Sequence, residues 1–193
     1  MTLSTGWELV PPPPPVDLQK VRDGTDTAWG PEASRIQLKH LSASGFVRAV
    51  EKVFQSYYPR VPGRKGLEDA WVCFTSGERF TNASLPLVAD AKPYVVEAWR
   101  PVDEEAQDAP FSRKDIFWYP TLAMNLDIKK SLPTEGVEWL FLRTMARKIH
   151  NGRLDLQVMI LDEDGDLVAL ASHVNMVLSA SRNLAKRESK EKL

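Results

Sequence analysis

The feature that most constrains this chain is an alternating strand held between two turn signals. Residues 153–160 alternate between apolar side chains and others, which is the period of a strand with one face in a core. Asn151-Gly152 precedes it and Asp164-Gly165 follows it, and both pairs favour the positive φ angles of type I′ hairpin turns. The pattern predicts three consecutive antiparallel strands: about 138–149, 153–161 and 167–179.

Two more strands and a helix are expected before these three. Residues 70–75 and 117–128 are rich in aromatic and β-branched side chains, as buried strands are. Between them, capping oxygens and a helical apolar spacing predict a helix over about 84–99. Pro93 removes one backbone donor, so we expect a kink just after Asp90.

The two ends of the chain are expected to lie outside the core. Residues 1–34 contain the run Pro11 to Pro15, which is extended and reads as a linker or tail, or as an SH3-type or WW-type ligand. Residues 35–60 suit either an amphipathic helix or a lead-in strand. Residues 182–193 are mostly charged and read as a tail. The expected domain is therefore 35–181, with its core at 70–181.

Composition excludes several classes of function. The 25 Lys and Arg nearly balance the 26 Asp and Glu, so no basic field favours nucleic acid. No apolar run approaches the roughly 18 to 20 residues of a membrane-spanning helix, and no signal sequence is apparent. We expect a cytoplasmic protein, although the final Glu-Lys-Leu resembles the peroxisomal Ser-Lys-Leu signal except at its first position.

The sequence offers no cofactor or metal motif. Cys73 is the single cysteine, which rules out an internal disulfide and reads as a small core residue. The glycines are scattered and form no phosphate-binding loop, and the three histidines lack metal-ligand spacing. We expect neither a cofactor nor a metal.

Three segments carry a family resemblance. Residues 76–85 with Ala89-Asp90, residues 117–128, and the stretch from 138 to 174 resemble fungal thioesterase-like proteins related to the type II acyl-CoA thioesterases. The resemblance covers about 70–187 and is to the second of two tandem hot-dog domains. It implies an α+β fold: a single hot-dog domain whose long central helix is wrapped by a five- to six-stranded antiparallel sheet.

The resemblance also implies a partner and a set of site residues. Hot-dog active sites lie at the seam between two domains, so we expect a homodimer or pairing with another hot-dog domain. In type II thioesterases an aspartate at the position of Asp90 helps to orient the attacking water. A glutamine matches His173, and a threonine or other polar residue lies near Thr121 and Asn125. We expect Asp90 and His173 to meet across a contact between two copies.

The alternation of the last strand adds a reason to consider His173. It places His173 on one face with Ala169, Ala171 and Asn175, where small neighbours leave room beside a group that titrates near neutral pH. Thr121 and Asn125 are four apart on one strand, so they are expected to share a face. The candidate catalytic residues are Asp90, His173, Asn125 and Thr121.

Each candidate also has a structural interpretation. Asp90 could lie on a solvated helix flank, His173 could be a satisfied core histidine, and Thr121 and Asn125 could be ordinary strand polar residues. The expected function is hydrolysis of an acyl thioester carried on coenzyme A or a carrier protein. The alternatives are a non-hydrolytic protein that binds an acyl or polyketide-like ligand, and a dehydratase or cyclase.

Overall fold

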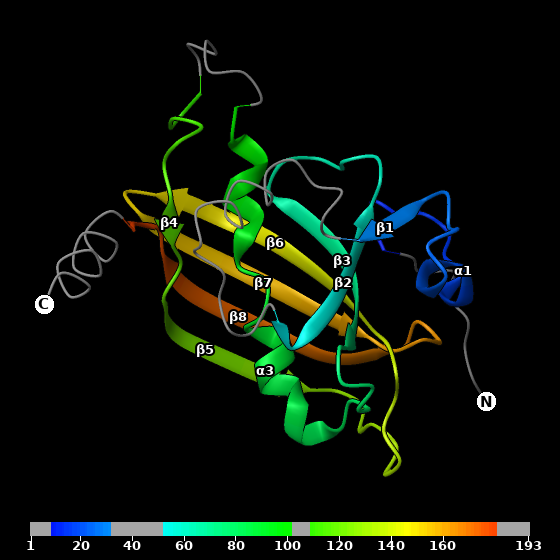
Figure 1. Ribbon diagram of the computed structural model, residues 1–193. Helices are drawn as coiled ribbons and strands as arrows, with labels where there is room; N and C mark the ends of the chain where they lie inside the picture. The colour runs from blue at the N-terminus through cyan, green and yellow to red at the C-terminus, as the bar shows by residue number, and fades with distance from the viewer. Residues whose placement is uncertain (1–8, 32–51, 102–108, 181–193) are drawn as a thin grey trace, which may run out of the picture.

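A curved antiparallel sheet forms the body of the protein (Figure 1). The computed structural model describes residues 9–31, 52–101 and 109–180. The sheet has seven strands in the order β1-β2-β3-β6-β7-β8-β5. Their bounds are β1 Trp29–Pro31, β2 Phe54–Pro59, β3 Leu67–Phe74, β5 Thr121–Ile128, β6 Leu140–His150, β7 Arg153–Leu161 and β8 Leu167–Met176.

The three strands predicted from turn signals are confirmed as β6, β7 and β8, which are adjacent and antiparallel. Asn151 and Gly152 join the first two with φ angles of 50° and 72°, as a type I′ turn requires. Leu154, Leu156, Val158 and Ile160 are all buried on one face of β7. The alternating pattern therefore identified the core face of the central strand.

The turn between β7 and β8 is wider than predicted. Leu161 pairs with Leu167, and Gly165 has a φ of 83° whereas Asp164 does not lie in the left-handed region. The carboxylate of Asp162 accepts hydrogen bonds from the N–H groups of Asp164 and Asp166 at 3.1 and 2.9 Å. This side chain stabilises a longer loop, so the expectation of a type I′ turn here is wrong.

Two predicted strands are each divided in two. Residues 117–128 form β4, Phe117–Trp118, and then β5, with Pro120 between them. Residues 167–179 form β8 and then β9, Leu178–Ser179. β4 and β9 pair with each other outside the main sheet. Pro120 cannot donate to a ladder, which accounts for the first division.

The predicted long helix is replaced by short helical segments. They are η3, Asn82–Ser84, α3, Leu85–Ala89, and the 3-10 helix η4, Tyr94–Trp99. Pro93 lacks an N–H and disfavours helical geometry in the residue before it, so the helix breaks rather than kinks. Asp90 is the C-cap of α3 and lies at this break. No helix in the described ranges is long and apolar enough to cross a membrane.

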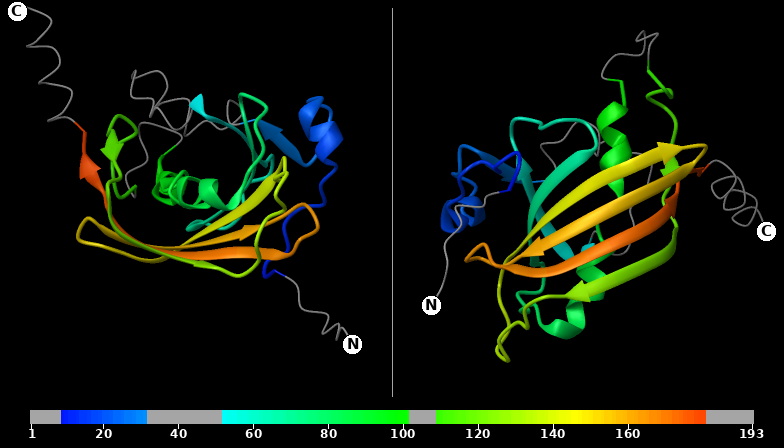
Figure 2. Two further views of the ribbon diagram at one scale, coloured as in Figure 1. Left: turned by 90° about the horizontal axis from the view of Figure 1, so that it is seen from below. Right: turned by 180° about the vertical axis from the view of Figure 1, so that it is seen from behind.

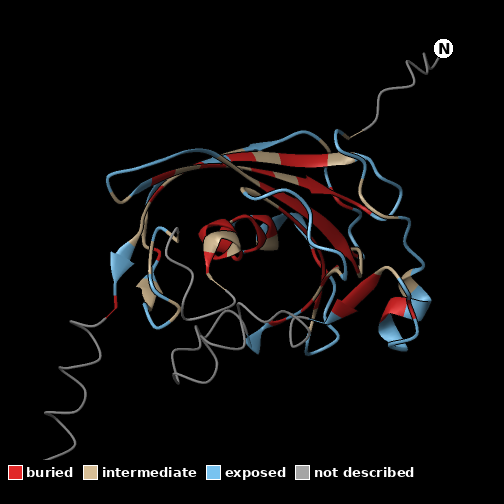
Figure 3. Cartoon of the chain, turned by 90° about the horizontal axis from the view of Figure 1, so that it is seen from above, coloured by how far each residue is buried: buried red, intermediate tan, exposed pale blue. Residues whose placement is uncertain are grey.

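The helical segments lie in the hollow of the sheet (Figures 2 and 3). Leu85, Val88 and Ala89 of α3 are buried, and so are Tyr94, Val95 and Val96 of η4. These side chains join the inner face of the sheet in one large apolar core. Burial of these apolar side chains, rather than helix propensity, stabilises such short segments.

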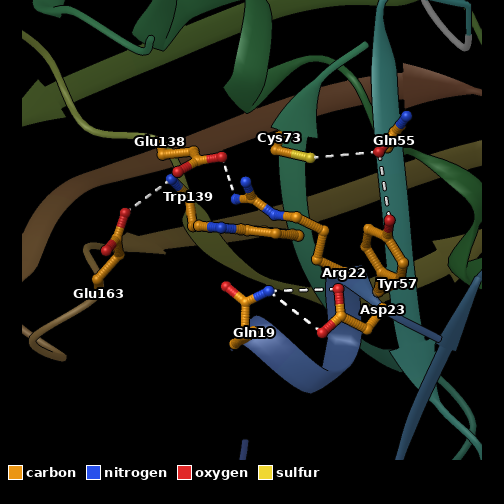
Figure 4. A network of polar contacts seen from close by, with 9 residues as sticks. All are labelled: Gln19, Arg22, Asp23, Gln55, Tyr57, Cys73, Glu138, Trp139 and Glu163. Atoms are coloured by element: carbon orange, nitrogen blue, oxygen red, sulfur yellow. Dashed lines mark hydrogen bonds and ion pairs between the residues drawn. The ribbon is translucent and has the colours of Figure 1, made fainter. Parts of the chain in front are cut away.

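The opposite face of the sheet carries a second, smaller core that includes the N-terminal residues. Val21 of α1, Leu18–Arg22, and Trp29 of β1 pack with Trp71, Trp139 and other apolar side chains. Arg22 binds Glu138 and lies over the Trp139 ring at 5.5 Å from its centroid (Figure 4). Part of the segment assigned to a linker therefore belongs to the folded body.

The strand count exceeds the five to six expected, because β1 and β2 extend the sheet beyond β3. β1 comes from the predicted linker, and β2 begins at Phe54, within the segment for which helix and strand were both considered. Most of that segment, residues 35–51, lies outside the described residues, and so does the predicted charged tail, 182–193.

A buried ion pair joins β3 to β6 beside the second core. Arg143 donates from Nε and one terminal nitrogen to the two carboxylate oxygens of Asp69, both at 2.7 Å. The residues are 1% and 6% exposed. Removing one partner would leave the other charge without compensation in an apolar setting.

We expect Asp69→Ala to lower the free energy of unfolding by about 3–5 kcal/mol, because it leaves the buried guanidinium of Arg143 without a counter-charge. Denaturant titration monitored by circular dichroism measures this change. Asp155→Ala is the matched control, because it breaks the exposed pair with Arg153 and should cost about 1 kcal/mol or less. Equal losses for the two variants would contradict this assignment.

Candidate active site

Four polar side chains from three elements converge where the helical layer breaks. Asp90 caps the C-terminus of α3, Thr121 is the first residue of β5, and His173 and Asn175 lie two residues apart on β8. Because strand side chains alternate, both β8 residues point to the inner face of the sheet. The convergence depends on the break after Ala89, which leaves a polar residue facing that inner face.

The start of β5 is held by contacts on both sides. The N–H of Met176 donates to the carbonyl of Pro120 at 3.0 Å, and Thr121 is the register partner of Asn175. The Tyr119 hydroxyl donates to the buried Glu97 carboxylate of η4 at 2.5 Å. Burial raises the pKa of Tyr119 far above its ordinary value, so its hydroxyl stays neutral and remains a donor.

A relay of two hydrogen bonds runs through the Thr121 hydroxyl. Asn175 Nδ2 donates to Thr121 Oγ1 at 2.7 Å. Thr121 Oγ1 donates to Asp90 Oδ1 at 2.6 Å, a short distance typical of a bond to a carboxylate. The relay fixes one oxygen of Asp90 against the sheet.

The imidazole of His173 lies beside the same carboxylate oxygen. Its Nδ1 is 3.8 Å from Asp90 Oδ1, too far for a direct hydrogen bond. Burial lowers the pKa of His173, and the neighbouring Asp90 charge only partly opposes this effect. His173 is therefore neutral near pH 7, and one of its ring nitrogens can accept a proton.

Access to solvent differs sharply among the four residues. The Asp90 side chain is 37% exposed, whereas that of His173 is 2% exposed and Asn175 is fully buried. His173 Nε2 and Asn175 Oδ1 have no hydrogen-bond partner among the described residues. The site therefore has one accessible carboxylate, with a neutral imidazole and a hydroxyl donor beside it. Such a set of groups can hold a water molecule and accept its proton.

The structure brings together three of the four candidate residues: Asp90, His173 and Thr121. The expectation that Asp90 and His173 meet across a contact between two copies is wrong, since the two side chains lie 3.8 Å apart within one chain. The break after α3 lies against the inner face of β8, so no second copy is required for their contact.

Asn125 lies away from the site. A β-bulge between Thr121 and Ala123 shifts the register, so that Asn125 pairs with Ser172. One extra residue reverses which side chains face inward, and Asn125 is exposed on the outer face. The expectation that Thr121 and Asn125 share a face is therefore wrong.

Asn175 was not among the candidate residues, although it belongs to the relay. Its spacing of two from His173 placed it on the same strand face, and a fully buried asparagine requires hydrogen bonds. That spacing was the available signal. The identity of its partner, Thr121, depends on strand pairing, which the sequence does not specify.

The remaining reactive groups do not extend this site. Burial raises the pKa of the Cys73 thiol to about 11, which keeps it protonated and a poor nucleophile. Among the described residues, no group of three or more His, Cys, Asp or Glu side chains is arranged to hold a metal ion.

Comparison with known proteins agrees with this fold. The chain is 32% identical over 216 residues to the thioesterase-like protein TwmA of Talaromyces wortmannii, covering 100% of this chain and 60% of that protein. The chain thus spans less than two thirds of the length of that curated relative.

Solved structures share the fold at low identity. A putative thioesterase II from Thermobifida fusca YX matches with a TM-score of 0.51 and 18% identity, covering 66% of this chain and 47% of that one. A hot-dog protein from Alicyclobacillus acidocaldarius matches with a TM-score of 0.51 and 14% identity, covering 65% and 46%. The hot-dog fold expected from the sequence is confirmed. Residues 15–177 match the family model of the acyl-CoA thioesterase C-terminal domain, and the chain belongs to that family.

Proposed function

We propose that this protein hydrolyses an acyl thioester by direct attack of water. The observation that carries the proposal is the position of Asp90, which is accessible on one side and held by the Thr121 hydroxyl on the other. A neutral imidazole stands 3.8 Å from the same oxygen. A carboxylate and an imidazole in this relation can orient a water molecule and take its proton.

The proposed step needs no covalent enzyme intermediate. A water oxygen bound at Asp90 attacks the thioester carbonyl carbon, and its proton passes to Asp90 or to His173. The carbon–sulfur bond then breaks, and the thiol leaves with that proton while the acid departs. Thr121 keeps the carboxylate oriented throughout. Family membership supports acyl groups on coenzyme A or on a carrier protein as the substrate class.

A non-hydrolytic binding role is the second candidate, and one observation favours it. His173 is buried to 2% exposure of its side chain, so the imidazole meets a ligand only if the neighbouring chain segments move. If the polar residues of the site only stabilise the core, the domain would bind an acyl or polyketide-like ligand without cleaving it.

The edge of the sheet supports a partner for this domain. β5 is the last strand of the described sheet, and Leu122, Met124 and Ile128 on it are 64%, 38% and 47% exposed. A long, apolar edge strand is a template for pairing with another strand. We propose that a second copy, or another hot-dog domain, pairs along β5 and so closes the side of the site at Thr121.

We expect Asp90→Asn to reduce hydrolysis at least about 100-fold, because the amide cannot accept the proton of the attacking water. Release of free thiol from short-, medium- and long-chain acyl-CoA substrates measures the rate. Asp164→Asn, which changes an exposed carboxylate in the loop between β7 and β8, is the matched control and should retain wild-type activity. Full turnover by the Asp90 variant would exclude the proposed role.

The rate is expected to fall on the acid side as His173 gains a proton. The pKa of His173 lies below its ordinary value of 6.5, so the neutral form predominates above that pH and is lost as the pH falls through the lowered value. Profiles of kcat/KM against pH for the wild type and His173→Gln measure this limb. An identical acid limb in the variant would assign it to another group.

Pairing along β5 predicts a particle of twice the 21.8 kDa chain mass in size-exclusion chromatography with light scattering at micromolar concentration. Leu122→Asp should shift the particle to monomer, because it places a charge at the paired edge. Val61→Asp is the control, since Val61 is 80% exposed in a loop. A wild-type monomer would refute pairing of two copies along β5.

A further inference from the structure

We infer that Asn175 is a positioning residue that fixes the direction of the Thr121 hydroxyl toward Asp90. Its effect on turnover rests on the proposed hydrolase function, whereas its effect on the hydrogen-bond relay does not. The inference starts from the two bonds of the relay, 2.7 Å from Asn175 to Thr121 and 2.6 Å from Thr121 to Asp90.

The Thr121 hydroxyl has a single proton and can accept from elsewhere. With Asp90 Oδ1 as its acceptor at 2.6 Å, that proton points at the carboxylate. Any group that approaches Thr121 Oγ1 from the other side then has to be a donor. The Asn175 amide therefore presents its nitrogen, not its oxygen, to Thr121.

This donor makes the relay directional. Asn175 Nδ2 donates to a lone pair of Thr121 Oγ1. If the hydroxyl proton of Thr121 rotated toward the amide, the O–H and N–H donors would face each other. The orientation with the proton on the Asp90 side is the one that satisfies all three groups. Asn175 thus acts through Thr121 and does not contact the water that Asp90 would hold.

The surroundings of Asn175 indicate why an amide at this position is significant. The residue is fully buried, and its Oδ1 has no hydrogen-bond partner in the described part of the chain. It faces Leu154 of β7 on one side and Thr121 on the other. A buried, half-satisfied amide costs stability that a leucine would not. The contact that offsets this cost is the bond to Thr121.

Loss of the amide donor should weaken catalysis without abolishing it. Thr121 would keep its hydroxyl but could turn the proton away from Asp90, while Asp90 and His173 would remain. The loss corresponds to one hydrogen bond, or about tenfold in kcat. KM should change less than about twofold, because the effect falls on the chemical step and not on substrate binding.

Two substitutions test the inference in the 193-residue chain. Asn175→Leu removes both polar atoms and should lower kcat about tenfold at every pH. Asn175→Asp keeps the shape but offers only acceptors when ionised, so two carboxylates would compete for one hydroxyl proton. Acidification protonates one of them and restores a donor. The ratio of Asn175→Asp to wild-type kcat should therefore rise as the pH is lowered from 8 to 5.

Gln157→Leu and Gln157→Glu are matched controls, because Gln157 lies on β7, away from β5, and pairs with Ser172 on the face opposite to Asn175. Both should keep the wild-type kcat, and the ratio of each variant's kcat to the wild-type kcat should not change with pH. A pH-independent loss of kcat in Asn175→Asp would overturn the inference. Unchanged kcat per folded enzyme in both Asn175 variants, which a purely structural role predicts, would overturn it as well.

A measurement without substrate separates this inference from the proposed function. The melting temperature of Asn175→Asp relative to the wild type should rise as the pH falls from 8 to 5, whereas that of Asn175→Leu relative to the wild type should stay level. If the wild type releases no thiol, the hydrolase proposal fails, and the donor assignment is decided by repeating this measurement with Thr121→Val, because desolvation of the new carboxylate is common to both backgrounds. The rise in Asn175→Asp should be larger with Thr121 present, since the protonated carboxyl can then donate to its hydroxyl. An equal or larger rise in the Thr121→Val background would refute the donor assignment.

Discussion

Burial of two short helical segments against a curved sheet is the constraint on which the rest of this protein depends. α3 and η4 are too short to be stable alone, so their apolar residues must remain in the hollow of the sheet. Pro93 prevents them from forming one helix, and the break leaves Asp90 beside the inner face of β8. A polar residue at that place has to find partners in the sheet.

The partners come from strands that meet at one corner of the sheet. Thr121 begins β5 just after Pro120, and Asn175 lies at its register position on β8. His173, two residues away, is buried beside the same carboxylate, and burial keeps it neutral. The polar corner is thus a consequence of how the core closes, and it supplies a carboxylate, a hydroxyl and an imidazole to one place.

The outer face of the sheet explains why the N-terminal segment matters for stability. Val21 and Trp29 cover the aromatic side chains of β3 and β6, which would otherwise be an exposed apolar patch. The Asp69–Arg143 pair lies on these same strands and satisfies both charges out of water. A segment rich in proline therefore completes a core, while β5 at the far edge keeps its apolar side chains exposed.

Sequence reasoning located the elements that depend on local pattern. Strict alternation identified β7 and its buried face, Asn151-Gly152 identified the turn before it, and the position of Pro93 identified the interruption near Asp90. The family resemblance added the fold, Asp90 and Thr121. These features arise from side-chain period, backbone preference and the missing N–H of proline, all of which are encoded within a few residues.

Tertiary structure decided which polar groups meet. The bulge at Leu122 removed Asn125 from the inner face, and strand pairing brought Asn175 to Thr121 across 54 residues of chain. Packing also placed Asp90 and His173 in one chain and folded α1 and β1 onto the outer face. By itself the sequence determined β6, β7 and β8, the turn between β6 and β7 and an interruption of the helix at Pro93. Register and long-range packing decided the site, because a shift of one residue reverses a strand's faces.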